Sequence, residues 1–457
     1  MHSQHVEFCA VEQLLNTTRD PHSIVAFDNQ HQINWQSFLN DVNHYQSLLI
    51  SHSAKRVALC FANSYLFSVG LFAAIHAGKA LVLPGNYQPE AVRELTPHFD
   101  VLLHDENIEI AEGVESLSVK SRSLEQYIQP QVKNLNADEV ELTLFTSGSS
   151  GQAKAIQKSL TQLDSEIAIL ESLWGEQLRC SRIESTVSHQ HIYGLLFRVL
   201  WPLCAGRPFA IHNLEYPEQL VHHADKDTVL ISSPALLKRL TQEHQSTPLR
   251  GLFSSGGPLP NSAATHSEAL FDHLPIEVFG STETGGIAFR QQRTPDTSWS
   301  LFPGVQAELN QENCLRLLAP HINGSEWYQT ADECHFHDTV SFELKGRTDR
   351  IVKIEEKRIS LVEVEKRLDQ LEWIEESAVI PLVDDQRLSL SAVIVLSPLG
   401  LTELERIGKG KFWIALRKRL RDWLEPIAIP RKYRLLEEIP LNSQGKRQVA
   451  EIEKLFQ

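Results

Sequence analysis

The chain has 457 residues, of which 43 are Lys or Arg and 58 are Asp or Glu, giving a formal net charge of −15, and 42% are hydrophobic. This length predicts more than one folded core, and the composition is that of a globular rather than a disordered protein. The acidic balance argues against non-specific nucleic-acid binding, and no apolar run reaches the roughly 18 residues that a membrane-spanning helix needs.

The start of the chain and its cysteines predict a compartment. The first fifteen residues contain Glu7 and Glu12 and lack a basic cluster, so no secretory leader is expected. Six cysteines are scattered along the chain without a CxxC pair: Cys9, Cys60, Cys180, Cys204, Cys314 and Cys334. This pattern favours reduced thiols in a cytoplasmic protein over disulfides or a zinc site.

Short apolar runs predict strands through the first two-thirds of the chain. They lie at residues 57–61, 80–83, 101–103, 228–231 and 276–279. A helical pattern at residues 65–77 separates the first two runs. Such alternation favours βαβ units and therefore an α/β fold with mostly parallel sheets.

A hydroxyl- and glycine-rich stretch follows a predicted strand at 141–145 and precedes a polar segment, 156–173, that is predicted to enter a helix. Its residues include Thr146, Ser147, Gly148, Ser149, Ser150, Gly151 and Lys154. Backbone N–H groups and hydroxyls in such a turn can surround phosphate oxygens, and the lysine adds a cation. The spacing differs from that of a P-loop. The stretch therefore predicts a nucleotide site of another kind. A flexible Ser/Gly linker is the alternative.

Further polar turns follow in order along the chain. They are Ser255-Gly256-Gly257, Phe279-Gly280-Ser281-Thr282-Glu283, Tyr328 to Asp332, Gly346-Arg347-Thr348-Asp349, and Pro440 to Lys446. Each of these turn sequences alone is common at protein surfaces. Their order within one chain is far more specific.

The character of the chain changes near residues 346–349. Beyond them the pattern predicts an amphipathic helix at 359–373, strands at 378–381 and 391–396, and a second helix at 412–424. One apolar stripe of that second helix holds Phe412, Leu416, Leu420, Trp423 and Leu424. We therefore predict an N-terminal domain at 1–345, a hinge at 346–349 and a small α+β domain at 350–457.

Charge is distributed unevenly between these parts. Residues 1–349 hold 23 Lys or Arg against 40 Asp or Glu, whereas residues 350–457 hold 20 against 18. Nine basic residues gather in 409–434, with only Asp422 and Glu425 to balance them. This segment is either a solvated helix face or a docking surface for an anionic partner.

Taken together, these turns make the chain resemble the adenylate-forming superfamily, the AMP-binding enzymes that include acyl- and aryl-CoA synthetases. The resemblance covers nearly everything after the first twenty residues. It implies a large N-terminal domain of mostly parallel sheets flanked by helices, with a small, mobile C-terminal α+β lid. It also implies ATP-dependent conversion of a carboxylic acid to an acyl-adenylate, followed by transfer to the thiol of CoA or phosphopantetheine.

The resemblance assigns nucleotide roles to the first three turns. Lys154 ends what looks like the phosphate-binding loop, residues 146–154. The segment Ser255, Gly256 and Gly257 matches the part that lies against adenine, and Phe279, Gly280 and Ser281 lead into the next motif. There, Thr282 would contact phosphate and Glu283 would hold Mg²⁺, which prefers carboxylate and phosphate oxygens.

The later turns resemble the parts that bind ribose and complete catalysis. Asp332 would bind the ribose hydroxyls with support from Arg347, and Asp349 falls at the hinge. Lys446 matches the lysine that reaches the acyl-adenylate, where a cation would neutralise two anions brought together.

The predicted acid pocket contains His191 as a gate, with Tyr193 and Gly194 lining it. A satisfied core histidine is the alternative for His191. Phe279 stands where the family commonly has tyrosine, which favours an apolar or aromatic acid over an amino acid.

One departure affects the acceptor. The resemblance implies a glycine a few residues after Lys353, but the run from Lys353 to Arg358 has none, and Glu356 stands where the pantetheine arm would pass close to backbone. Adenylation is therefore better supported than thioester formation, and a nucleotide-binding protein without thioester activity is the alternative. An acyl carrier protein docking at 409–434 is predicted ahead of free CoA.

Overall fold

The computed structural model describes residues 6–85, 87–122, 135–147, 153–241, 246–322, 325–354, 357–384, 387–421, 424, 426–441 and 447–456. Its chain divides into two compact units. Unit 1 comprises Met1–Gln306 and Leu318–Tyr328, and unit 2 comprises Ala307–Leu317 and Gln329–Gln457. The predicted hinge at 346–349 lies within the residues of unit 2, and a lid that moves from residue 350 onward stays a prediction.

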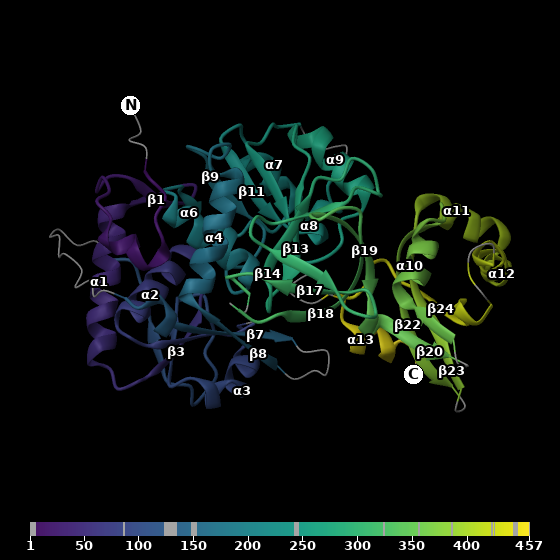
Figure 1. Ribbon diagram of the computed structural model, residues 1–457, viewed down its shortest axis with the longest axis horizontal. Helices are drawn as coiled ribbons and strands as arrows, with labels where there is room; N and C mark the ends of the chain where they lie inside the picture. Colours follow the sequence, from purple (N-terminus) through teal and green to yellow (C-terminus); the bar gives the residue numbers. More distant parts are fainter. Residues whose placement is uncertain are drawn as a thin grey trace. The chain divides into compact units, whose positions relative to one another are not determined.

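Unit 1 contains a sheet with the strand order β6-β5-β3-β4-β7-β8. Figure 1 labels β3, β7 and β8 of this sheet. Its strands are β3 (Arg56–Cys60), β4 (Ala80–Leu83), β5 (Val101–His104), β6 (Ser116–Ser118), β7 (Glu141–Ser147) and β8 (Ala153–Ser159). All neighbours pair in parallel except β7 and β8, which are antiparallel. The mostly parallel α/β character predicted from the alternating pattern is confirmed.

A second run of strands in unit 1 has the order β15-β14-β13-β12-β11-β9-β10-β1-β2. Its strands are β1 (Ile24–Phe27), β2 (Gln32–Asn34), β9 (Arg182–Ser185), β10 (Phe209–Ala210), β11 (Thr228–Ser232), β12 (Gly251–Ser254), β13 (Ile276–Ser281), β14 (Gly285–Arg290) and β15 (Trp299–Leu301). In the middle of this run, the neighbouring strands β13-β12-β11-β9-β10-β1 all pair in parallel. The strand pairs at its two ends are antiparallel. Parallel strands end at one edge of a sheet, where ligand loops gather.

The helices of unit 1 cover these sheets. They are α1 (Trp35–Ser51), α2 (Ser64–His76), α3 (Pro89–Glu94), α4 (Leu160–Trp174), α5 (Ile192–Gly194), α6 (Trp201–Cys204), α7 (Pro217–His223), α8 (Pro234–Leu237) and α9 (Asn261–Phe271). A π-helical turn, Leu195–Leu200, joins α5 to α6, and 3-10 turns lie at Val11–Asn16, Thr96–His98 and Ala137–Glu139. Every residue of α2 is buried, as its near-continuous apolar sequence requires.

Unit 2 begins with β16 (Gln306–Leu309), β17 (Cys314–Leu318), β18 (Tyr328–Phe336) and β19 (Ser341–Arg347), which follow one another in one sheet. A 3-10 turn, Thr348–Arg350, leads to the hairpin β20 (Ile351–Ile354) and β21 (Lys357–Ser360). A three-stranded sheet of β22 (Ile374–Asp384), β23 (Arg387–Leu396) and β24 (Lys432–Leu435) follows.

The helices of unit 2 are α10 (Leu361–Asp369), α11 (Pro398–Ile407), α12 (Lys409–Leu420) and α13 (Val449–Lys454), with a 3-10 turn at Pro426–Ala428. The predicted apolar stripe is confirmed in part: Phe412, Leu416, Leu420 and Leu424 are buried in one core cluster. Trp423 lies outside the described residues.

Candidate functional site

The predicted phosphate loop joins two antiparallel strands. The expectation that it leads from a strand into a helix is wrong, because β8 intervenes before α4 begins at Leu160. Within the hairpin, Thr146 lies opposite Lys154 in the strand register, so both belong to one end of the ladder. Ser147 closes β7, and the predicted phosphate-loop residues Gly148, Ser149, Ser150 and Gly151 lie outside the described residues.

The turn between β13 and β14 holds the predicted phosphate and metal residues. Gly280 cannot be replaced without a shift, since a Cβ there would lie 2.0 Å from the carbonyl oxygen of Gly285. The backbone N–H of Ser281 donates to Thr284 Oγ1 at 3.0 Å, which closes the turn. Thr282 and Glu283 lie between these two anchors and are partly exposed.

Lys154 and Glu283 meet although 129 residues separate them. Lys154 Nζ donates to Glu283 Oε1 at 2.6 Å, and the side chains are 57% and 25% exposed. Burial alone would raise the pKa of Glu283, but the hydrogen bond and charge of Lys154 lower it overall. The same hydrogen bond raises the pKa of Lys154, so both groups are held in their charged forms.

Three buried side chains that the sequence analysis missed lie under this turn. Lys158, Glu166 and His321 are each at most 3% exposed. Lys158 Nζ donates to the Glu283 carbonyl at 2.7 Å, Glu166 Oε1 accepts from the Gly286 N–H at 2.7 Å, and His321 Nε2 lies 2.8 Å from the Gly286 carbonyl. The sequence offered one signal for Glu166, which is a charged residue within the apolar stripe of α4. The neighbouring Leu163, Ile167 and Leu170 of that stripe are buried.

Burial shifts the pKa of each of these three groups. It lowers the pKa of Lys158 below its ordinary value, while the charges of Glu166 and Glu283 oppose it. It raises the pKa of Glu166 to about 7, against the Gly286 hydrogen bond and Lys158. It lowers the pKa of His321 to about 4, so the ring is neutral near pH 7 and donates from Nε2 to the Gly286 carbonyl.

The segment predicted to lie against adenine follows β12. Ser255 Oγ donates to the Val278 carbonyl of β13 at 2.8 Å, and β12 pairs in parallel with β13. Gly256 has φ +98°, a backbone conformation that favours glycine. Gly257 follows with open space around the position of a Cβ. This segment and the turn after β13 therefore leave the same edge of the sheet.

The predicted acid pocket lies around α5. Gly194 is packed against backbone, since a Cβ there would lie 2.0 Å from the Ser188 carbonyl oxygen. Tyr193 and Phe197 have ring centroids 4.8 Å apart. His191 precedes α5 and is partly exposed, whereas its neighbour His189 is buried and within 2.8 Å of Ser64 Oγ.

The ring of Phe279 lies in a second aromatic contact. Its centroid is 5.4 Å from that of Trp299. The position that commonly holds tyrosine in the family therefore packs here against an indole.

Unit 2 brings together the predicted ribose carboxylate and its arginine. Asp332 in β18 lies opposite Arg347 in β19, and Arg347 Nη1 donates to Asp332 Oδ1 at 3.3 Å. The Asp332 N–H also donates to Thr330 Oγ1 at 3.1 Å. Strand register alone thus places the carboxylate beside its predicted support.

Glu365 of α10 joins two distant parts of unit 2. Arg350 makes two hydrogen bonds to its carboxylate, each 2.8 Å, and Arg447 Nη1 lies 2.7 Å from Oε1. The Val379 N–H donates to the same carboxylate at 2.7 Å. The backbone of Asp349 lies in the 3-10 turn before β20, and Lys446 and Glu356 lie outside the described residues.

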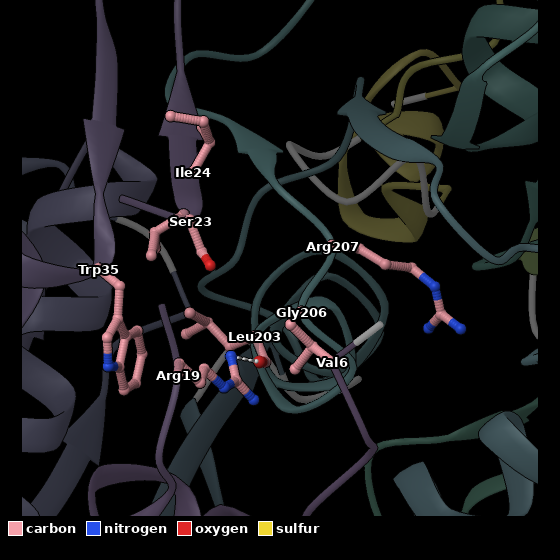
Figure 2. A pocket seen from close by; sticks show the side chains of 9 residues that line it. Val6, Arg19, Ser23, Ile24, Trp35, Leu203, Gly206 and Arg207 are labelled. Carbon is pink, nitrogen blue, oxygen red and sulfur yellow. Dashed lines mark hydrogen bonds between the residues drawn. The ribbon is translucent and has the colours of Figure 1, made fainter. Parts of the chain in front are cut away.

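A small hollow lies elsewhere in unit 1, bordered by Arg19, Trp35, Leu203 and Gly206 among others (Figure 2). Arg19 reaches across it to donate to the Leu203 carbonyl at 2.6 Å. None of the predicted site residues lines this hollow. Across the described part of the chain, no helix combines the length and the apolar character needed to cross a membrane.

Comparison with known proteins gives consistent results. The family described as AMP-binding enzyme matches residues 13–329. D-alanine–D-alanyl carrier protein ligase of Staphylococcus aureus (strain Newman) is 23% identical over 488 residues, covering 95% of this chain and 96% of the relative.

Solved structures share the fold. ATP-bound MatB from Rhodopseudomonas palustris has a TM-score of 0.80 at 18% identity, covering 97% of this chain and 98% of that one. A benzoate CoA ligase from Burkholderia xenovorans LB400 has a TM-score of 0.78 at 18% identity, covering 94% and 96%.

Proposed function

Because the chain belongs to the family of AMP-binding enzymes, we propose that it is an AMP-forming acid–thiol ligase. It joins a carboxylic acid to the α-phosphate of ATP, releases pyrophosphate, and passes the acyl group to a pantetheine thiol. The contact between Lys154 and Glu283 carries the proposal, because it unites the two motifs assigned to phosphate and metal. Such a meeting of distant polar turns is what a nucleotide site requires.

The residues at this contact fit a nucleotide with its divalent ion. Glu283 offers a partly exposed, ionised carboxylate, and Mg²⁺ prefers one or two such ligands with phosphate oxygens and water. Bound Mg²⁺ would neutralise charge on the phosphate oxygens. Lys154 is held in its charged form and is more than half exposed, so its ammonium group can turn from Glu283 to a phosphate.

We assign the remaining residues by position. Thr282 lies beside Glu283 and would donate to phosphate, while Asp332, steadied by Arg347, would accept from the ribose hydroxyls. Lys446 would approach the bridging oxygen as the acid attacks, where a point charge stabilises the anion that develops. Asp349 would be the hinge that lets the lid turn between the two half-reactions.

An aromatic or other apolar acid is the proposed substrate class. The paired rings of Tyr193 with Phe197 and of Phe279 with Trp299 would give the proposed pocket flat apolar surfaces, and His191 would gate it. A nucleotide-binding protein without thioester activity is less favoured, because the relatives include a carrier-protein ligase and CoA ligases.

A screen of aryl, acyl and amino acids for pyrophosphate release tests the proposed function. At least one acid should release pyrophosphate and yield AMP, in step with loss of ATP. Formation of ADP, or failure of every acid class under conditions where MgATP binds, would contradict it.

We propose the basic segment 409–434 as the docking surface for an acyl carrier protein. Along α12 and its end, Lys411, Ile414, Lys418 and Arg421 are exposed at spacings of three and four residues, so they share one face. Ile414 is 68% exposed. A basic stripe around one apolar side chain complements an acidic amphipathic helix.

The double variant Lys411→Glu/Lys418→Glu should raise the KM for a phosphopantetheine-loaded acyl carrier protein about tenfold, because the attraction becomes repulsion. The KM for CoA and the kcat should stay unchanged. Lys55→Glu/Lys226→Glu, which changes two exposed lysines of unit 1 by the same charge, is the control. Equal loss with both acceptors, or efficient use of CoA with no carrier loading by the wild type, would refute this docking surface.

We also propose a cytoplasmic location. All six cysteines are free thiols in the structure, and such thiols persist where the compartment is reducing.

A further inference from the structure

Buried side chains from three different segments contact the backbone of the turn that carries Glu283. Lys158 comes from β8, Glu166 from α4, and His321 from the segment that precedes β18. Together they contact the backbone of the turn at three atoms: the Glu283 carbonyl, the Gly286 N–H and the Gly286 carbonyl. None of these contacts uses the Glu283 side chain, whose carboxylate accepts from Lys154 instead.

Lys158 also interacts with each of the other two residues. Lys158 Nζ donates to the His321 carbonyl at 3.2 Å as well as to the Glu283 carbonyl. The charges of Lys158 and Glu166 stabilise each other, as the opposing effects on their pKa values indicate. The neutral ring of His321 completes the set from the other side of Gly286.

The two glycines of the turn make this approach feasible. A Cβ at Gly285, whose φ is +66°, would lie 2.2 Å from Glu166 Oε2. A Cβ at Gly286 would lie 2.6 Å from the Phe302 ring and 3.2 Å from Glu166 Oε1. Larger residues at either position would push the carboxylate away from the backbone that it holds.

Burying an ammonium and a carboxylate is costly, and apolar side chains of similar size often serve stability as well or better. Polar groups in such a place are worth their cost when they fix the geometry of a functional group. Resting on the function proposed above, we propose that Lys158, Glu166 and His321 form a buried clamp that positions Glu283 for the divalent ion of the nucleotide. They are positioning residues, since they act through the backbone of the turn.

The same helix provides a matched control. Glu171 of α4 is five residues beyond Glu166 and accepts from Arg207 at 2.8 Å and from Trp201 Nε1 at 2.6 Å. This is a partly buried charged network, but it faces α6 and does not touch the turn. Glu171→Gln should weaken α4 packing and leave the clamp intact.

The test measures how strongly Mg²⁺ and nucleotide binding are coupled. The Kd of a non-hydrolysable ATP analogue is determined by calorimetry with and without Mg²⁺, for the full chain. Lys158→Met should reduce the gain in affinity from Mg²⁺ about tenfold, the usual scale for loss of an outer-shell partner. Glu166→Leu should do the same, whereas Glu166→Gln should restore coupling because its amide oxygen still accepts from Gly286.

A purely structural role predicts another pattern. If Lys158→Met lowers the melting temperature but keeps wild-type coupling, or if Glu171→Gln loses as much coupling, the clamp is refuted. His321→Phe tests the clamp in a second way. It removes the Nε2 donor to the Gly286 carbonyl without introducing or removing a formal charge. The coupling between Mg²⁺ and nucleotide binding is measured in the absence of any carboxylic acid substrate. Failure of the pyrophosphate screen would therefore overturn the ligase proposal without affecting the test of the clamp.

Discussion

At the scale of single residues, the paired charges of Lys154 and Glu283 connect motifs far apart in sequence. Each satisfies the other, and each would exchange its partner for part of the nucleotide. An ion pair this exposed contributes little to folding, about 0.2–1 kcal/mol. The role proposed for this pair is therefore in nucleotide binding, and it adds little to stability.

Lys154→Met should raise the KM for ATP about tenfold or more, because a charged hydrogen bond to phosphate is worth about 1.5–3 kcal/mol. The free energy of unfolding in urea should change by less than about 1 kcal/mol. Initial rates at varied ATP and a denaturation curve measure both. Lys120→Met, at another exposed lysine with a carboxylate partner, is the control; an unchanged KM for ATP in Lys154→Met would remove this lysine from the site.

Candidate site residues could be identified from the sequence where an ordered motif holds them, but not where only burial brings them to the site. Lys154, Glu283, Asp332 and Arg347 stand in ordered polar turns, and the structure brings them together as two pairs. Lys158 stands in no such motif, and a lysine side chain is usually solvated. Only the folded hairpin shows that its ammonium points inward.

At the scale of elements, the strands were predicted well and the first residues of helices poorly. The runs near 57–61, 80–83, 101–103 and 228–231 are all strands, within a residue or two. The segment 156–173 was predicted to lead directly into a helix, yet its first residues, 156–159, belong to β8. Its alternation is real, since Ile156 and Lys158 are buried while Ala155 and Gln157 are exposed, but a charged residue on the inner face concealed it.

The helices of unit 2 show the same limit. The predicted helix 359–373 is α10, Leu361–Asp369, because Ser360 caps its start by accepting from the Glu363 N–H. The residues before it belong to β21, and those at its far end lead into β22. Capping side chains fix such boundaries more sharply than apolar periodicity does.

At the scale of the whole molecule, the fold class followed from alternating strands and helices, and the family resemblance added the expectation of a small C-terminal lid. Neither route determines where a mobile lid begins. The order of strands, with antiparallel partners at the ends of parallel runs, came only from the structure. Pairing between strands distant in sequence leaves no local signature.

Lys446→Ala should abolish ATP–pyrophosphate exchange and spare thioester formation from preformed acyl-adenylate, because this lysine would act only while pyrophosphate leaves. The two half-reactions are measured separately, with labelled pyrophosphate and with a thiol acceptor. Lys454→Ala, at an exposed lysine of α13 paired with Glu451, is the control. Equal loss of both half-reactions would contradict a lysine that serves one step.

Glu365 has a consequence for protein engineering. Its carboxylate binds Arg350, directly after Asp349, and Arg447, directly after Lys446. In a chimera whose junction lies between these two arginines, one of them would come from the other protein. If its side chain no longer paired with Glu365, the buried carboxylate would lose a partner, and such an unpaired buried charge typically costs about 3–5 kcal/mol. Segments grafted from relatives should therefore carry residues 350–447 as one piece, with both seams outside it.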